Sequence, residues 1–150
     1  MRTLTIDWAD LEIAFRDAGT ESYLDKEGGE VLSIVDGFDD ERDLRERLAR
    51  FPGRFVRVVP VDKAFSTAVL ERFIARQKAG PFTKRLVEAF SGAGGLSRTM
   101  ALLREDKATF ASFSRFEQAE LLKTIEDFLR KHGLHADSDP PALELFEGMA

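Results

Sequence analysis

The residues best suited to chemistry are basic side chains in the middle third of this 150-residue chain. Residues 51–100 carry 9 basic and 3 acidic side chains, although the whole chain has a net charge of −5. Because such side chains neutralise phosphates and acidic surfaces, they predict a binding patch. The candidate residues, called the basic set below, are Arg72, Arg76, Lys84, Arg85 and Arg98. The sequence favours the other interpretation, in which these side chains pair with the acidic segment Asp39–Asp43 of the same chain.

Two further motifs could bind a ligand but favour a structural role. Gly92-Ala93-Gly94-Gly95 precedes a predicted helix and could offer amides to a phosphate. It lacks the Lys-Ser/Thr of a P-loop and follows a helix, which favours a helix–helix turn. His132 and His135, the only histidines, straddle a predicted helix end with no acid placed to complete a metal site. This position favours helix capping.

No set of residues predicts catalysis. The chain has no cysteine, which excludes thiol nucleophiles, disulfides and cysteine metal sites. Its serines lack the G-x-S-x-G context, and most carboxylates are expected on solvent-exposed faces beside arginines. We therefore predict no catalytic residues, no metal and no cofactor.

These residues need elements to position them, and the clearest is a hairpin over Glu21–Val35. Its centre, Asp25-Lys26-Glu27-Gly28-Gly29, has turn chemistry, with Gly29 expected at positive φ. Arg54–Val59 predicts a third strand. Helices are predicted at about Asp7–Gly19, Asp40–Phe51, Asp62–Gly80, Pro81–Phe90, Leu96–Leu103 and Ser114–Gly133. The last rests on the capping box Ser114-Arg115-Phe116-Glu117.

Together these elements predict an α+β fold: a small antiparallel sheet of about three strands, a hairpin plus one, packed with about six helices. We expect one domain over residues 1–135 and a tail over 136–150, disordered or docked as a short helix. The first residues lack a signal-peptide pattern, and no apolar run reaches the length of a membrane span. The expectation is a cytoplasmic protein without membrane contact.

The order of elements resembles the bacterial uncharacterised-protein family 0158, over most of residues 5–134. The resemblance rests on Tyr23-Leu24-Asp25, Gly29-Glu30-Val31, the passage from Val59-Pro60 to Phe73-Ile74, Gly92-x-Gly94, and Phe110 and Phe113 before a long last helix. The chain departs from the family where basic residues cluster around the second glycine, since only Arg98 keeps the charge, and Phe110 stands where a tryptophan is expected. The resemblance implies a fold and no activity.

We expect a non-catalytic protein-interaction or regulatory module. Its partner would be a protein, and the charge of the basic set would favour an acidic one. The first alternative is nucleic-acid binding through the basic set, which the acidic net charge of −5 disfavours. A small enzyme is the third. The sequence leaves the partner and the oligomeric state open.

Overall fold

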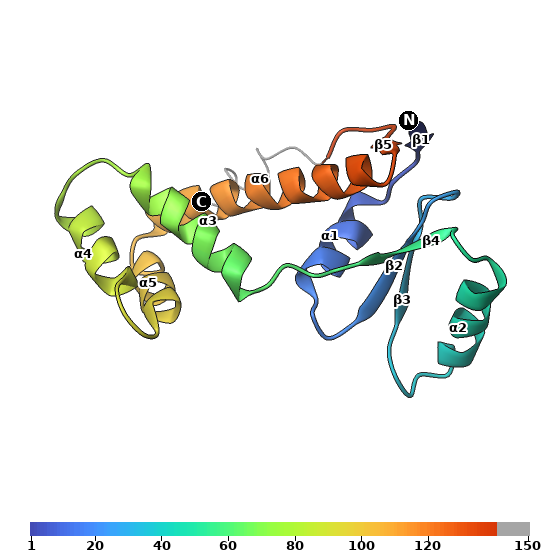
Figure 1. Cartoon of the computed structure of the whole chain (residues 1–150). Coiled ribbons are helices and arrows are strands. Elements are labelled where there is room, and N and C mark those ends of the chain that lie inside the picture. Colours follow the sequence, from blue (N-terminus) through green and yellow to red (C-terminus); the bar gives the residue numbers. More distant parts are fainter. Residues whose placement is uncertain (141–150) are drawn as a thin grey trace. The chain divides into compact units, whose positions relative to one another are not determined.

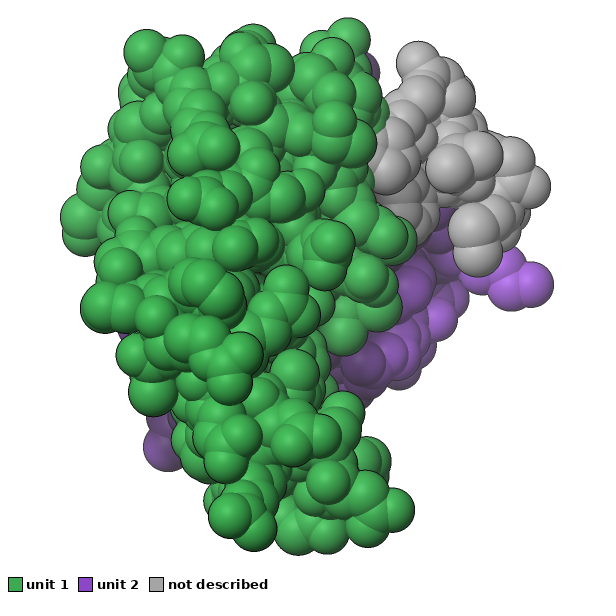
Figure 2. Space-filling model, turned by 90° about the vertical axis from the view of Figure 1, so that its right-hand side faces the viewer, with its two compact units in different colours: residues 1–61, 122–141 green, residues 62–121, 142–150 purple. Residues whose placement is uncertain are grey.

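The computed structural model describes residues 1–140. This part of the chain divides into two compact units (Figure 2). Unit 1 comprises residues 1–61 and 122–140, and unit 2 comprises residues 62–121. The elements (Figure 1) are β1 (Arg2–Leu4), α1 (Trp8–Arg16), β2 (Glu21–Asp25), β3 (Val31–Ile34), α2 (Glu41–Arg50), β4 (Phe55–Val58), α3 (Lys63–Ala75), α4 (Pro81–Phe90), α5 (Gly95–Leu103), α6 (Lys107–Lys131) and β5 (Leu134–Ala136).

The predicted three-stranded antiparallel sheet forms in unit 1, with strand order β3-β2-β4, and confirms the α+β class. Ser22 of β2 lies opposite Ser33 on one side and Val58 on the other. Leu24 and Val58 are fully buried. Both α1 and α2 contact β3, and Figure 1 shows them on opposite sides of the sheet. The hairpin is therefore covered by helices, as a small isolated hairpin in water requires.

The turn of the hairpin is held against the N-terminal segment. Gly29 has φ of +81°, as its position in the turn predicts. A Cβ atom at Gly29 would lie 1.9 Å from the backbone oxygen of Thr5. Two conditions thus require glycine here: the left-handed backbone and the close approach of another chain segment.

A second, parallel pair of strands joins the two ends of unit 1 and was not predicted. Arg2 of β1 lies opposite Leu134 of β5, and Leu4 lies opposite Ala136. Three-residue strands are too short to show the alternation that marks a strand in sequence. The expected boundary between residues 135 and 136 falls inside β5. Of the expected tail, residues 141–150 lie outside the described residues.

Unit 2 is helical and has its own apolar core. Phe73 of α3 meets Phe113 of α6 edge to face, with ring centroids 5.2 Å apart. Pro81 occupies the first turn of α4, as predicted. The buried residues of this core are Val69, Leu70, Phe73, Ile74, Leu86, Leu103 and Phe113.

Two predicted helix boundaries were wrong. The helix α3 ends at Ala75 rather than near Gly80, and the Gln77 side chain donates to the Phe73 carbonyl at this end. The helix α6 begins at Lys107, so Ser114 lies in its interior and its capping box starts no helix. Burial of Phe113 in the core continues the helix through this segment, because packing outweighs a local capping preference. Within residues 1–140, no helix is long and apolar enough to cross a membrane.

Candidate functional site

Three members of the basic set have partners inside unit 2. Arg72 Nη2 lies 3.2 Å from Glu120 Oε2, and Arg85 Nη2 lies 3.5 Å from Glu105 Oε2. The Arg76 guanidinium carbon lies 5.0 Å from the centroid of the Phe116 ring, a cation–π geometry. The recorded ion-pair partners are therefore Glu105 and Glu120 rather than the acidic segment Asp39–Asp43, where Glu41 pairs with Arg45 at 3.3 Å.

Arg98 binds the chain's own backbone. Its guanidinium donates to the carbonyl oxygens of Ser91 at 2.7 Å and Ala89 at 3.2 Å, and also to that of Ala93. These carbonyls belong to the end of α4 and the glycine segment, where a cation compensates the helix dipole. A Cβ at Gly95 would lie 2.1 Å from the Phe90 carbonyl oxygen. The segment thus forms the predicted helix–helix turn, with Arg98 as its internal cap.

Lys84 is exposed, and among the described residues the structure records no ion pair or ring contact for it. Four of the five basic residues therefore make separate contacts, and they lie on α3, its C-terminal cap, α4 and α5. Phosphate binding by these residues stays a prediction.

One histidine follows the C-terminal end of α6, and the other lies in β5. His132 follows α6, and its ring lies edge-on to Phe128 with centroids 4.9 Å apart. Burial lowers the pKa of His132 below its ordinary value. His135 lies in β5. Among residues 1–140, no group of three or more His, Asp or Glu side chains is arranged to hold a metal ion.

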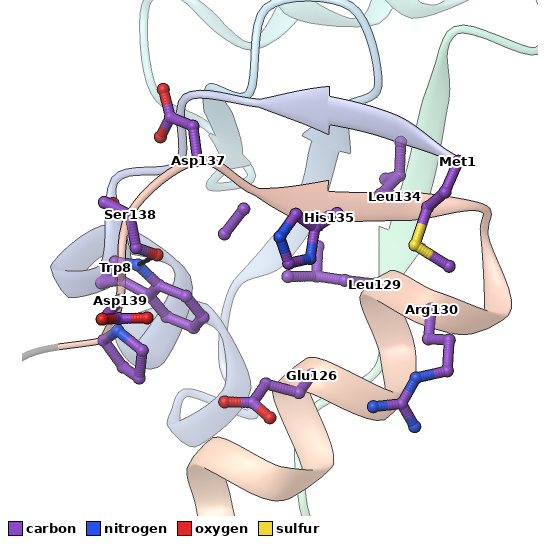
Figure 3. Close-up of a pocket in the computed structure, with 12 residues that line it drawn as sticks. Met1, Trp8, Glu126, Leu129, Arg130, Leu134, His135, Asp137, Ser138 and Asp139 are labelled. Carbon is purple, nitrogen blue, oxygen red and sulfur yellow. Dashed lines mark hydrogen bonds between the residues drawn. The ribbon is translucent and has the colours of Figure 1, made fainter.

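A cavity of about 490 Å³ lies in unit 1 between the start of α1, the end of α6 and β5 (Figure 3). Three buried apolar side chains form part of its wall: Trp8, Leu129 and Leu134. Figure 3 shows the Trp8 ring on one side of the cavity and Met1 and Arg130 on the other. A volume of this size lies within the range of about 300–1,000 Å³ that is typical of ligand pockets.

The orientation of Trp8 is set by a hydrogen bond. Its indole Nε1–H donates to the backbone oxygen of Ser138 at 3.2 Å. The segment after β5 is itself held, since the Asp137 N–H donates to the Leu4 oxygen and the Asp137 carboxylate accepts from Thr5 Oγ1 at 2.6 Å. The wall of the cavity is therefore formed before a ligand arrives.

No family model, curated protein or solved structure matches this chain. The resemblance to family 0158 accordingly stays a prediction. The geometry of the cavity is thus the basis for assigning a function.

No pattern in the sequence predicts this cavity. Its lining combines residues 1 and 8 with residues 126–140, and no local pattern reports that these two segments meet. The available signal was composition: the chain has one tryptophan, and it lies at Trp8 near the first predicted helix start. A lone tryptophan is more often a core residue than a binding residue, so that signal alone could not assign the site.

Proposed function

We propose that this protein is a non-catalytic interaction module of the cytoplasm that binds a segment of a protein partner in the Trp8 cavity. The observation that supports this proposal is the concave wall of Trp8, Leu129 and Leu134, with polar groups around it. Tryptophan is enriched among the residues that dominate binding energy at interfaces. Because the Trp8 ring is already oriented by Ser138, its ordering costs little when a ligand binds.

The mixed lining favours a peptide segment over a purely apolar ligand. Besides the apolar wall, the cavity presents the side chains of Glu126, Arg130, His135 and Asp139. A peptide offers apolar groups and polar groups at short spacing, which matches such a surface. The proposal requires no catalytic step.

The test uses the single tryptophan as a reporter, since its indole N–H gives one resolvable nuclear magnetic resonance signal. The full chain would be titrated with three panels of short peptides, which are basic, acidic and apolar. At least one panel should shift the Trp8 indole signal saturably and leave the amide of Leu86, in the core of unit 2, unchanged. If all three panels left Trp8 unchanged, the proposal would be wrong.

Nucleic-acid binding through the basic set remains the second candidate. The supporting observation is charge segregation between the units. Residues 62–121 carry 10 basic and 7 acidic side chains, whereas residues 1–61 and 122–140 together carry 12 basic and 18 acidic side chains. The internal contacts of Arg72, Arg76 and Arg98 weigh against this candidate, because a phosphate would have to compete with them.

A further inference from the structure

We propose that the partner inserts an arginine side chain into the Trp8 cavity, with its guanidinium against the Trp8 ring and between Glu126 and Asp139. This inference rests on the proposed function and names the chemistry of the partner. It differs from the expectation drawn from the basic set, which pointed to an acidic partner.

The charged side chains that line the cavity favour a cationic ligand. Besides Asp137, whose carboxylate is directed away, its side chains include two carboxylates, on Glu126 and Asp139, and one guanidinium, on Arg130. Arg130 is paired with Asp127, with Nη1 and Oδ1 3.0 Å apart. The cavity therefore has an excess of negative charge, which favours a cationic ligand.

The carboxylates of the lining differ in whether the chain itself already binds them. The Asp137 carboxylate accepts from Thr5 Oγ1, and Figure 3 shows it directed away from the cavity. For Glu126 and Asp139 the structure records no ion pair within residues 1–140. Figure 3 shows the Glu126 carboxylate turned toward the side of the cavity that holds Trp8, and Asp139 follows Ser138, the hydrogen-bond partner of Trp8. Two carboxylates with no ion pair recorded within residues 1–140 thus line the same cavity as Trp8.

The aromatic ring of Trp8 also favours a cationic ligand. The indole N–H of Trp8 is already bonded to Ser138 and Trp8 is 7% exposed, so the ring contributes the small uncovered part of its aromatic surface rather than a donor. A cation held within about 6 Å of a tryptophan ring is attracted to its face, and arginine is the commonest protein partner in this geometry. Arginine also matches carboxylates with several donors in one plane and is weakly hydrated, so it enters a part-apolar cavity at lower cost than lysine.

The net charge of unit 1 favours a basic partner at longer range. The described part of unit 1 carries 18 acidic and 12 basic side chains. Its field therefore attracts a basic segment and repels an acidic one before contact is made. Association should accordingly weaken as salt is added, because screening shortens the range of this field.

The experiment compares two pools of acetylated, amidated nine-residue peptides. Both have degenerate flanking residues, and the central residue is arginine in one pool and citrulline, its neutral isostere, in the other. We expect the arginine pool to shift the Trp8 indole signal at a concentration at least about tenfold lower, as charge-assisted contacts are stronger than neutral ones. Glu126→Gln and Asp139→Asn should each weaken the arginine pool by about three- to tenfold and leave the citrulline pool unchanged.

The matched control is Glu46→Gln on α2, which removes the same charge from an exposed glutamate outside the cavity lining. It should leave binding of the arginine pool within about twofold of wild type, since screened surface charges act weakly at a distance. Both Glu126 and Asp139 are exposed, so the cavity variants should fold, and a thermal melt of each confirms that they do.

The outcomes separate the two proposals. Equal shifts from the citrulline and arginine pools would overturn the arginine inference and leave the interaction function in place. Unchanged arginine binding in both Glu126→Gln and Asp139→Asn would also overturn it. If neither these pools nor the acidic and apolar panels moved the Trp8 signal, both proposals would fall.

Discussion

Asp25 and Arg54 are joined by two hydrogen bonds in one plane. Arg54 Nε donates to Asp25 Oδ1 at 2.9 Å, and Nη2 donates to Oδ2 at 2.8 Å. The Asp25 side chain is only 1% exposed, and it also accepts the backbone N–H of Glu27 at 2.9 Å. This carboxylate therefore fastens the hairpin turn to the segment before β4, and it is committed to the fold rather than to a ligand.

Replacing Arg54 with methionine should lower the free energy of unfolding by about 3–5 kcal/mol, because it leaves a buried carboxylate without its partner. Urea denaturation of the full chain measures this loss. The control is Arg42→Met, which removes an 89% exposed arginine paired with Glu46, and its effect should stay within about 1 kcal/mol. Equal losses in the two variants would contradict the structural role of the Asp25 pair.

The same pair predicts a dependence on pH. The hydrogen bonds from Arg54 lower the pKa of Asp25 from its ordinary value of 3.8 to about 2. Since the folded state holds this proton less tightly, the stabilisation is complete above the ordinary pKa and is lost as the pH falls toward about 2. The difference in unfolding free energy between wild type and Asp25→Asn should therefore shrink between pH 4 and pH 2. A constant difference across this window would refute the assignment.

Gly29→Ala should destabilise the protein more than Gly53→Ala does. Both glycines have positive φ, at +81° and +83°, so each alanine carries a backbone strain of about 1–2 kcal/mol. Only at Gly29 would the added Cβ meet a backbone atom, the Thr5 oxygen at 1.9 Å, while nothing lies within 4 Å at Gly53. Thermal unfolding of the two variants decides the matter, and Gly29→Val should be worse than Ser33→Val for the same reason. Similar melting temperatures for Gly29→Ala and Gly53→Ala would show that the Thr5 contact is relaxed in solution.

Local chemistry could be predicted from sequence where one residue decides the structure. The Asp7 side chain caps α1 by accepting the Asp10 N–H, and Gly29 takes positive φ in the hairpin turn. Ser114 shows the limit of this reasoning, because the capping box there is overruled by the burial of Phe113 one residue earlier. A local signal predicts a helix start only if distant packing does not continue the helix through it.

The candidate site could not be predicted, because it depends on pairing between distant segments. The hydrogen bonds of Thr5 with Asp137 and of Trp8 with Ser138 join residues more than 120 positions apart. Neither segment has a periodicity that names its partner. The basic set was visible as composition, but its contacts with Glu105, Glu120 and the α4 carbonyls were not.

Truncation after His135 should lower the melting temperature relative to truncation after Pro140. The shorter chain loses the pairing of Ala136 with Leu4 and the hydrogen bonds of Asp137 and Ser138, all of which the longer chain keeps. Loss of several hydrogen bonds at about 1 kcal/mol each corresponds to several degrees for a chain of this size. This expectation replaces the one drawn from sequence, which ended the domain at residue 135 and placed residues 136–150 in a tail. Identical melting curves for the two truncations would restore it.

Generic DNA or RNA should show no measurable binding at physiological salt. The net charge of −5 repels phosphates at long range, and Arg76 is held over Phe116. Fluorescence anisotropy with single- and double-stranded oligonucleotides measures this directly. A micromolar complex that weakens with salt and is lost in Arg76→Glu with Arg85→Glu would promote the nucleic-acid alternative. Lys107→Glu with Lys131→Glu, both exposed and outside the basic set, is the charge-matched comparison.

The parallel pairing of β1 with β5 has a consequence for synthesis on the ribosome. β1 emerges first, yet its partner follows only after the whole of residues 62–121 has been made. Asp137, the hydrogen-bond partner of Thr5, lies 132 positions later in the chain. Unit 2 can fold before β5 is made, since its core residues all precede the C-terminal turns of α6. Unit 1 can complete its β1–β5 pair only after residues 62–121 have been inserted between the two strands in sequence. We therefore expect a released chain that ends at residue 133 to protect unit 2 from protease while the Trp8 wall is still accessible to chaperones.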